Sequence, residues 1–171
     1  IRENPSHRIH LLNQPNQGLA MARNNGIAIA LGKHILTLDA DDGLAPDFLA
    51  KTVAVLEANP DTHIVFTDLL RFGDADGVFQ TGEFSLAKLA ALNQLNYCSL
   101  YRREVFDAVG GYNPNLVWGY EDWDFWIGAA ERGFKARKIA EPLFRYRIKA
   151  GSMLTTAAKR VLPEPTSPTR R

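Results

Sequence analysis

A short apolar run that ends in three carboxylates constrains the fold of this chain more than any other stretch. Ile35-Leu36-Thr37-Leu38 is followed at once by Asp39-Ala40-Asp41-Asp42. Such a run is typical of a buried strand in an α/β sheet, and open α/β sheets bind ligands at the carboxyl ends of their strands. Crowded carboxylates repel one another unless a cation lies nearby, so the run predicts a divalent metal that holds phosphate oxygens. The alternative is an Asp-rich turn, because Asp42-Gly43 is a common turn dipeptide.

The composition is that of an ordinary globular domain. The chain has 171 residues, of which 46% are hydrophobic, and this is enough for one domain with a real core. A formal net charge of +1 gives no reason to expect a nucleic-acid partner. The single cysteine, Cys98, excludes an intrachain disulfide and fits a reducing compartment. No apolar run approaches the roughly 20 residues that span a bilayer, and no signal peptide is visible. We therefore expect a cytoplasmic protein without a membrane span, with peripheral attachment to the inner membrane face as a further option.

The order of the expected elements predicts a layered α/β domain over residues 1–154. Strand patterns at 8–12, 34–38 and 63–67 alternate with helix patterns that begin at 19 and 46, which argues for right-handed crossovers. The second half is less regular, with a hairpin or mobile loop at 73–82, helices at 86–92, 104–109 and 120–132, and strands at 97–101, 134–139 and 143–147. The expected buried stripe of helix 120–132 is Trp123, Trp126, Ile127 and Ala130. The polar, Pro-rich end predicts a disordered tail over 155–171.

A second acidic cluster, Gly119-Tyr120-Glu121-Asp122-Trp123-Asp124, opens the helix at 120–132. The helix macrodipole favours acids there by roughly 0.3–1 kcal/mol, which is a sufficient structural reason for them. The functional alternative is a general base, because burial and neighbouring carboxylates raise a carboxyl pKa while the helix end lowers it. The nearby Trp118, Tyr120 and Trp123 suit the face of a sugar ring and suit a hydrophobic core equally well.

Basic and amide side chains gather at two further places. Arg23 and Asn24 lie in the first helix after a Gly-containing loop, where they could reach a nucleotide or lie on a solvated helix face. Arg147 and Lys149 stand beside the turn Gly151-Ser152. These two cations could neutralise a leaving diphosphate, or could simply add surface charge.

Taken in order, these segments resemble the family 2 glycosyltransferases of the GT-A fold. The resemblance covers about residues 8–154 and depends on the order and spacing of its pieces. The pieces are Asn16-Gln17-Gly18, Ala22-Arg23-Asn24, Gly32-Lys33, Leu38-Asp39-Ala40-Asp41-Asp42, Arg102-Arg103-Glu104-Val105-Phe106, Val109-Gly110-Gly111-Tyr112, Gly119-Tyr120-Glu121-Asp122-Trp123, Tyr146-Arg147 and Gly151-Ser152-Met153. The resemblance implies an α/β, GT-A-like domain with a mixed, mostly parallel sheet flanked by helices.

The resemblance also implies a reaction, in which a sugar moves from a nucleotide-diphosphate donor to an acceptor hydroxyl, usually with inversion. Asp39-Ala40-Asp41 matches the family's Asp-x-Asp motif, so Asp41 would ligate Mg²⁺ or Mn²⁺ and Asp39 would help through the metal or the ribose. Asp122 would deprotonate the acceptor, and Glu121 would hold the acceptor or act as the base instead. Other implied donor contacts are Gly18, Arg23, Asn24, Arg147 and Lys149, and other implied acceptor contacts are Trp118, Tyr120 and Trp123. The acceptor would be a saccharide, a lipid-linked molecule or a protein.

The sequence departs from the family pattern at its beginning. Family members normally begin with one strand that ends near Tyr-Asn and a second that ends in Asp-Gly-Ser, and these segments grip the nucleotide base. Nothing here matches them, and the chain begins at Ile1 rather than Met. We therefore expect an N-terminally truncated domain that exposes a sheet edge. Near the other end, Lys149 stands where the family often has His.

Two other functions stay open. Phosphoryl transferases of the haloacid-dehalogenase kind also have Asp-x-Asp after a strand. Their motif requires Thr or Val two residues after the second Asp, where this chain has Gly43. The non-enzymatic alternative is a remnant of the fold that binds sugar nucleotides or acts as a scaffold without turnover.

Overall fold

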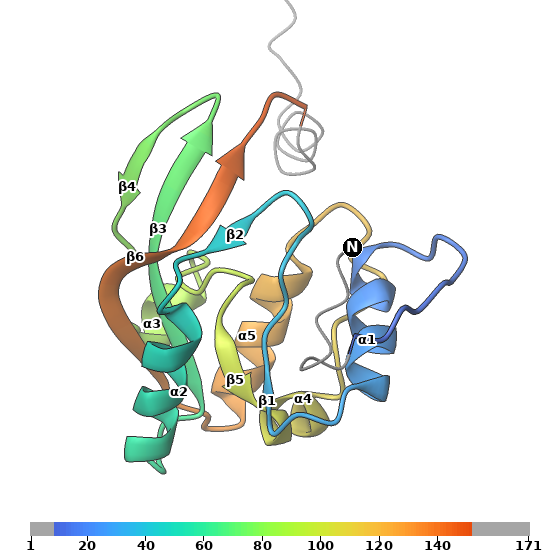
Figure 1. Ribbon diagram of the computed structural model, residues 1–171. Coiled ribbons are helices and arrows are strands. Elements are labelled where there is room, and N and C mark those ends of the chain that lie inside the picture. The colour runs from blue at the N-terminus through green and yellow to red at the C-terminus, as the bar shows by residue number, and fades with distance from the viewer. Residues whose placement is uncertain (1–8, 152–171) are drawn as a thin grey trace, which may run out of the picture.

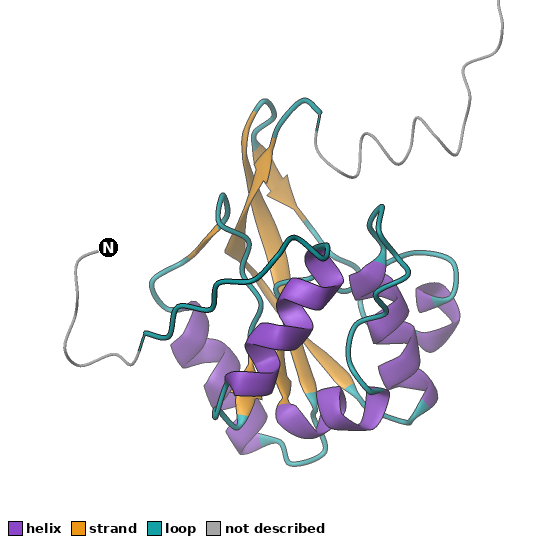
Figure 2. Cartoon of the chain, turned by 90° about the vertical axis from the view of Figure 1, so that its right-hand side faces the viewer, coloured by secondary structure: helices purple, strands orange, loops and turns teal. Residues whose placement is uncertain are grey.

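The structure is a computed structural model that describes residues 9–151, in which helices surround a six-stranded mixed sheet (Figure 1). The helices are α1 (Leu19–Ile29), α2 (Phe48–Ala58), α3 (Leu86–Leu89), α4 (Arg103–Val109) and α5 (Glu121–Glu131). The strands are β1 (His34–Ile35), β2 (Gly43–Leu44), β3 (Ile64–Gly73), β4 (Gly77–Phe79), β5 (Leu100–Arg102) and β6 (Ala136–Ile148). Figure 2 shows α1 in front of the sheet and the other helices around its lower half. Within the described part, no helix is both long and apolar enough to cross a bilayer.

The sheet is mixed, as predicted, but it is not mostly parallel. Its order is β1-β5-β3-β6-β2, and β4 pairs with β3 beside this path. β3 and β6 run parallel, whereas the other four pairings between described strands are antiparallel. The predicted hairpin at 73–82 is the β3–β4 connection, and a hairpin forces an antiparallel pair. Only the long route from β3 through α3, α4 and α5 to β6 returns the chain in the parallel direction.

One long strand, β6, replaces the two strands predicted at 134–139 and 143–147. Its pairing with β3 shifts register between Thr67 and Leu69, so the stretch around Pro142 bulges out of the ladder. Proline has no N–H to donate and is tolerated at such an irregularity. At the shift, Asp68 is buried and pairs with Lys138 at 2.8 Å.

Two other predicted strands differ from the structure. The strand expected at 8–12 is wrong over the described residues 9–12, which form no strand and leave Ile9 and Leu11 exposed. The strand expected at 34–38 shortens to β1, which pairs with β5 at His34 and Ile35, and beyond it the hydroxyl of Thr37 donates to the carbonyl of Tyr97 at 2.8 Å. The predicted tail at 155–171, together with Ser152 and Met153, lies outside the described residues.

The core that supports α5 is aromatic. Tyr101, Tyr112, Phe125 and Trp126 are almost fully buried, and the rings of Tyr112 and Phe125 stack with centroids 4.6 Å apart. The predicted stripe is right at Trp126, but its other members are only partly buried. The fully buried positions of α5 are Glu121, Phe125, Trp126 and Ala129. Glu121 lies on the same face of the helix as Phe125 and Ala129, four and eight residues later. Because Glu121 is a carboxylate, a pattern of apolar residues does not predict that it is buried.

Candidate functional site

The two acidic segments meet at the guanidinium of Arg23, in the second turn of α1. Its Nη1 donates to Oε1 of Glu121 at 2.6 Å, and its Nη2 donates to Oδ1 of Asp39 at 3.1 Å. Asp39 follows β1, and Glu121 is the first residue of α5. Segments that lie far apart in the sequence therefore share one site.

Two tyrosine rings pack against the same guanidinium. The Cζ atom of Arg23 lies 4.7 Å from the ring centre of Tyr97 and 5.6 Å from that of Tyr112. Cation–π contacts of this kind contribute about 0.5–2 kcal/mol, depending on desolvation. Burial alone lowers the pKa of Arg23, but Asp39, Tyr112 and Glu121 outweigh it and raise the pKa. Arg23 is therefore a fixed, permanent charge.

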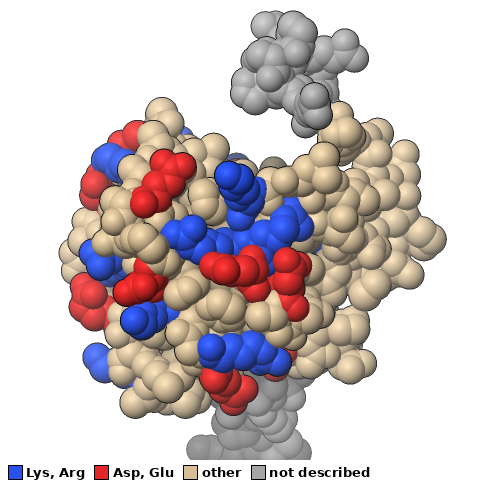
Figure 3. All heavy atoms as spheres, turned by 90° about the horizontal axis from the view of Figure 1, so that it is seen from below, with Lys and Arg blue, Asp and Glu red and all other residues tan. Residues whose placement is uncertain are grey.

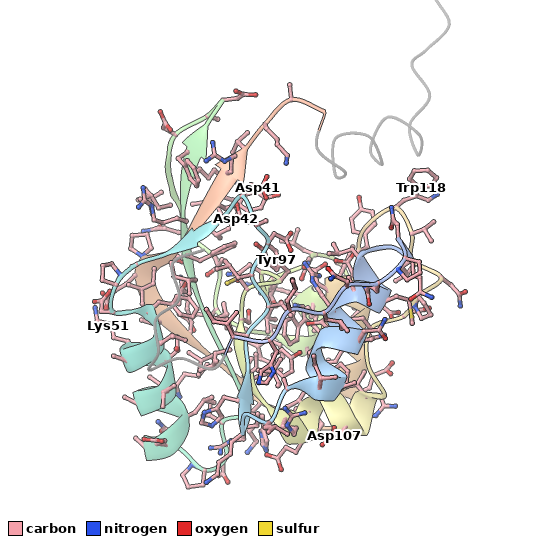
Figure 4. All side chains as sticks on the ribbon, turned by 45° about the vertical axis from the view of Figure 1, so that its right-hand side comes forward. Asp41, Asp42, Lys51, Tyr97, Asp107 and Trp118 are labelled. Carbon is pink, nitrogen blue, oxygen red and sulfur yellow. The ribbon has the colours of Figure 1, made fainter. Side chains whose placement is uncertain are left out.

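The acidic turn after β1 is held from two sides. The phenol of Tyr97 donates to Oδ2 of Asp42 at 2.5 Å and accepts the backbone N–H of Asp39 at 3.1 Å. The backbone N–H of Arg147 donates to the other oxygen of Asp42 at 2.7 Å. Burial raises the pKa of Asp42. Figure 4 shows Asp41 and Asp42 close above Tyr97. Asp42, which sequence reasoning left without a role, shapes the turn.

Asp41 lies at the outer edge of this turn beside two cations. Its carboxylate accepts a hydrogen bond from Nζ of Lys149, and its carbonyl oxygen accepts one from Nε of Arg147 at 3.1 Å. The hydrogen bond from Lys149 is the largest cause that lowers the pKa of Asp41. The arrangement places an ionised carboxylate and two positive charges together at the surface, where they could meet a diphosphate.

Asp39 and Asp41 are suitable ligands for a hard divalent cation only if other oxygens join them. Within residues 9–151, no three His, Cys, Asp or Glu side chains converge closely enough to hold an ion. Mg²⁺ is characteristically bound by one or two carboxylates together with water and substrate phosphates. The donor set therefore fits an ion that binds with a phosphorylated ligand.

Asp122 is held in a well-defined orientation in the first turn of α5. One carboxylate oxygen accepts from Nδ2 of Asn93 at 3.0 Å, and the other accepts the backbone N–H of Trp123 at 2.8 Å. Burial, and next the charge of Glu121, raise the pKa of Asp122 to about 6. A carboxyl group of this kind is ionised at neutral pH and still basic enough to accept a proton.

Both groups of acids act electrostatically on the phenol of Tyr146. Burial raises its pKa first, and Asp42, Asp39, Asp122 and Asp41 raise it further. All four carboxylates therefore lie within electrostatic reach of one hydroxyl group. A groove of about 510 Å³ begins beside Arg23 and Asp39 and follows α1 along the segment 34–40.

The side chain of Asn24, a predicted donor contact, is bonded to the backbone of Tyr112. Its Nδ2 donates to the carbonyl of Tyr112 and its Oδ1 accepts the N–H of the same residue, both at 2.8 Å. Gly18 stands at the N-cap of α1 with φ +86°, and its N–H donates to Oδ1 of Asn16 at 3.1 Å. The two bonds of Asn24 attach α1 to the segment before α5.

The predicted acceptor residues Trp118, Tyr120 and Trp123 lie just before α5 and in its first turn. Trp118 and Tyr120 are half exposed, and the ring centroids of Tyr120 and Trp123 lie 6.0 Å apart. The indole N–H of Trp123 donates to the carbonyl of Leu89 at 2.7 Å, which fixes this ring against α3. Tyr120 has φ +67°, an uncommon value for a residue other than glycine. Figure 4 shows Trp118 on the far side of α1 from Asp41 and Asp42.

Sequence reasoning missed three residues of the site, Asn93, Tyr97 and Tyr146. Asn93 and Tyr97 belong to the connection between α3 and β5, whose path no local pattern indicates. Tyr146 lies in a segment that the sequence singles out only for its cations.

Away from the acids, a second hollow of about 580 Å³ opens near the first residues of β3 and β6, between Asp61, Glu83 and the segment 135–138. Figure 3 shows the underside of the molecule, where Lys and Arg side chains gather beside Asp and Glu.

The chain belongs to glycosyl transferase family 2, whose sequence profile matches residues 2–110, more than half of its length. The family and the GT-A type of fold predicted from the sequence are thus confirmed.

The individual relatives are distant. The O-antigen biosynthesis protein RfbC of Myxococcus xanthus is 28% identical over 162 residues, which are 89% of this chain and 13% of that protein. The structure of S. aureus TarS 1–349 in complex with UDP-GlcNAc matches with a TM-score of 0.69 and 17% identity, over 87% of this chain and 44% of that one. The mannosyltransferase PcManGT from Pyrobaculum calidifontis, in complex with GDP-Man and Mn²⁺, matches with a TM-score of 0.58 and 18% identity, over 85% and 41%. The chain spans half or less of the length of the curated relatives it matches.

Proposed function

We propose that this chain carries the site of a metal-dependent glycosyltransferase that moves a sugar from a nucleotide-diphosphate donor to an acceptor hydroxyl with inversion. One observation carries the proposal: Arg23 bonds both Asp39 and Glu121 and so joins the acidic turn after β1 to the first turn of α5, where the carboxyl of Asp122 has a raised pKa. The named ligands of the structural neighbours, UDP-GlcNAc and GDP-Man with Mn²⁺, support the donor class.

On the donor side, Asp41 and Asp39 hold Mg²⁺ or Mn²⁺. When bound, the ion supplies positive charge against the diphosphate as that group departs. Lys149 and Arg147, which already flank Asp41, add two further charges for the same oxygens. The nucleotide and sugar lie along this edge, next to the turn that Tyr97 and Asp42 stabilise.

On the acceptor side, Asp122 is the general base. It takes the proton of the acceptor hydroxyl while that oxygen bonds the anomeric carbon and the bond to the diphosphate breaks on the opposite face, which inverts the centre. Asn93 orients the carboxylate of Asp122. Trp118, Tyr120 and Trp123 form the wall against which the acceptor packs.

For the acceptor, we favour a saccharide or lipid-linked saccharide of the cell envelope over a protein. The support is the relative from Myxococcus xanthus, which is named for O-antigen biosynthesis. Such a role suits a cytoplasmic protein at the inner face of the membrane.

The proposal is tested by calorimetric titration of the protein with UDP-GlcNAc and GDP-Man, with and without Mn²⁺. We expect one donor to bind only with Mn²⁺, and Asp41→Ala to weaken that binding about tenfold or more because a metal ligand is lost. Asp107→Ala is the matched control, since Asp107 is exposed on α4, well away from Asp41 (Figure 4). Binding that does not respond to Mn²⁺ or to Asp41→Ala contradicts the metal role.

The alternative function is sugar-nucleotide binding without turnover. Donor hydrolysis and transfer to saccharide acceptors, followed by release of the nucleotide, separate the two functions. Mn²⁺-dependent binding without nucleotide release would establish the non-catalytic function.

A further inference from the structure

The guanidinium of Arg23 is already engaged inside the protein. Its two terminal nitrogens bond Glu121 and Asp39, and the rings of Tyr97 and Tyr112 lie against it. The side chain is only 6% exposed. A donor could reach this cation only by displacing protein partners, which argues against the donor contact that the sequence suggests.

The stability of an ionised Glu121 depends more on the charge of Arg23 than that of Asp39 does, because Glu121 is more deeply buried. The Glu121 side chain is 6% exposed, whereas that of Asp39 is 34% exposed. An ionised carboxylate that is buried without a partner is strongly destabilising, so breaking a buried ion pair from one side costs far more than breaking an exposed one. Arg23 therefore neutralises Glu121 within the core, while Asp39 is left partly exposed for a ligand.

The helix that carries Arg23 is fixed at the same level by its neighbour. Asn24 forms two hydrogen bonds with the backbone of Tyr112, whose ring stacks on Phe125 of α5. Arg23 thus contacts α5 and the turn after β1, and its neighbour Asn24 contacts the core beneath α5. Arg23 is the only one of the two that reaches both acidic segments.

We propose that Arg23 is a positioning residue, which ties α5 to the turn after β1 and so holds Asp122 toward the donor, rather than a residue that binds the donor. This inference rests on the proposed function, because it assumes that Asp122 acts on an acceptor beside a donor held at Asp39 and Asp41.

Removal of the charge of Arg23 has a predictable electrostatic consequence. The groups that face Asp122 are Glu121, Asn93, Arg23 and the phenols of Tyr112 and Tyr146. Without Arg23, the charge of Glu121 is uncompensated beside Asp122, and neighbouring carboxylates hold a shared proton to higher pH. The site should then lose its last carboxyl proton about one pH unit higher than in the unchanged protein.

The test compares Arg23→Met, Arg23→Lys, Glu121→Gln and the double variant Arg23→Met/Glu121→Gln. The Asp122 carboxyl is titrated by carbon-13 NMR without metal or donor, and kcat and the donor dissociation constant are measured with Mn²⁺. We expect Arg23→Met to move the titration midpoint up and to lower kcat about tenfold or more, while donor affinity changes by less than about threefold. Arg23→Lys should restore part of both effects. In the Glu121→Gln background, Arg23→Met should move the midpoint little, because a neutral glutamine needs no counter-charge.

Two results would overturn the positioning role. One is a loss of donor affinity of about tenfold in Arg23→Met with an unchanged titration, which would make Arg23 a donor ligand. The other is an equal shift of the midpoint with and without Glu121. If Arg23→Met fails to fold, the titration midpoint, kcat and donor affinity are compared in Arg23→Lys and in the double variant instead. Neither of these variants leaves Glu121 as an unpaired charge. Lack of donor binding by the unchanged protein contradicts the proposed function, and the titration still decides the role of Arg23.

Discussion

The carboxylate of Asp122 is held by Asn93 and by the N–H of Trp123, and burial raises its pKa to about 6. Asp122→Asn keeps the size of the side chain and removes its ability to accept a proton. We expect kcat to fall about 100-fold or more with donor affinity unchanged, as for the loss of a general base. Asp124→Asn, an exposed change in the same turn of α5, is the control. Steady-state kinetics with a donor titration would contradict this role if affinity fell and kcat did not.

The raised pKa of Asp122 also has a cost in stability at neutral pH. The folded protein holds this proton up to a pKa of about 6, against an ordinary value of 3.8. The associated stability is therefore complete below about pH 4 and is lost as the pH rises through about 6. Asp122→Asn should unfold less readily than the unchanged protein at pH 8, by about 1–3 kcal/mol, with little difference near pH 4. Urea denaturation at the two pH values measures this, and a larger gain at pH 4 would refute it.

Single residues of the site differ in how far the sequence reveals them. Asp41 and Asp122 stand out because carboxylates at the end of a strand or the start of a helix are local patterns. Asn93 and Tyr97 do not, because a polar side chain in a connection gains its partners only when the whole chain has folded. The bonds of Asn24 to the backbone of Tyr112 have no local signal either, since its position beside Arg23 suggests a ligand contact.

At the scale of elements, α1 depends on Asn24 for its place in the fold. Asn24→Ala would leave the buried N–H and C=O of Tyr112 without their partner, at a cost of about 1–3 kcal/mol in the free energy of unfolding. Gly111 marks the closeness of this contact, because a Cβ there would lie 2.9 Å from Oδ1 of Asn24. Asn25→Ala is the control, since within residues 9–151 the side chain of Asn25 bonds side chains of the preceding loop, those of Gln14 and Gln17. Equal losses in the free energy of unfolding in the two variants, measured with urea, would contradict the role of Asn24 in holding α1 in place.

The helices follow the sequence more closely than the strands do. The patterns that predict α1, α2 and α5 lie within the helices themselves, so their bounds differ from the structure by a few residues at most. The extent of β1 depends instead on how far β5 runs beside it, and β6 is continuous because β3 pairs with it on both sides of the bulge. Pairing partners are distant in the sequence, and a local pattern does not contain them.

For the whole molecule, the aromatic core between the sheet and α5 contributes much of the buried apolar surface. Phe125 is fully buried and contacts the rings of Tyr101, Tyr112 and Trp126. Phe125→Ala should cost about 3–5 kcal/mol, through lost burial and the cavity that it leaves. Phe79→Ala, at a residue that is 45% exposed on β4, is the matched control and should cost far less. Thermal unfolding of both variants tests this, and similar midpoints would contradict it.

The alternation of strands and helices was enough to predict a layered α/β molecule, but it did not predict the strand directions. Direction depends on whether each connection turns back at once or crosses over, and beyond the hairpin at 73–82 the connections that lead to β5 and β6 have no clear local signal. The arrangement of the site was likewise not predictable from local patterns. Both acidic clusters were predicted, whereas their meeting at Arg23 depends on how α1 packs against α5.

The phenol oxygen of Tyr97 spans the acidic turn, with the N–H of Asp39 on one side and the carboxylate of Asp42 on the other. The loop is consequently preorganised: its conformational entropy is lost during folding, and an incoming ligand need not order it. Tyr97 in turn packs edge-on against Phe144, a fully buried residue of β6. Mutations in the interior at Phe144 should thus alter ligand affinity at the surface without touching the ligand.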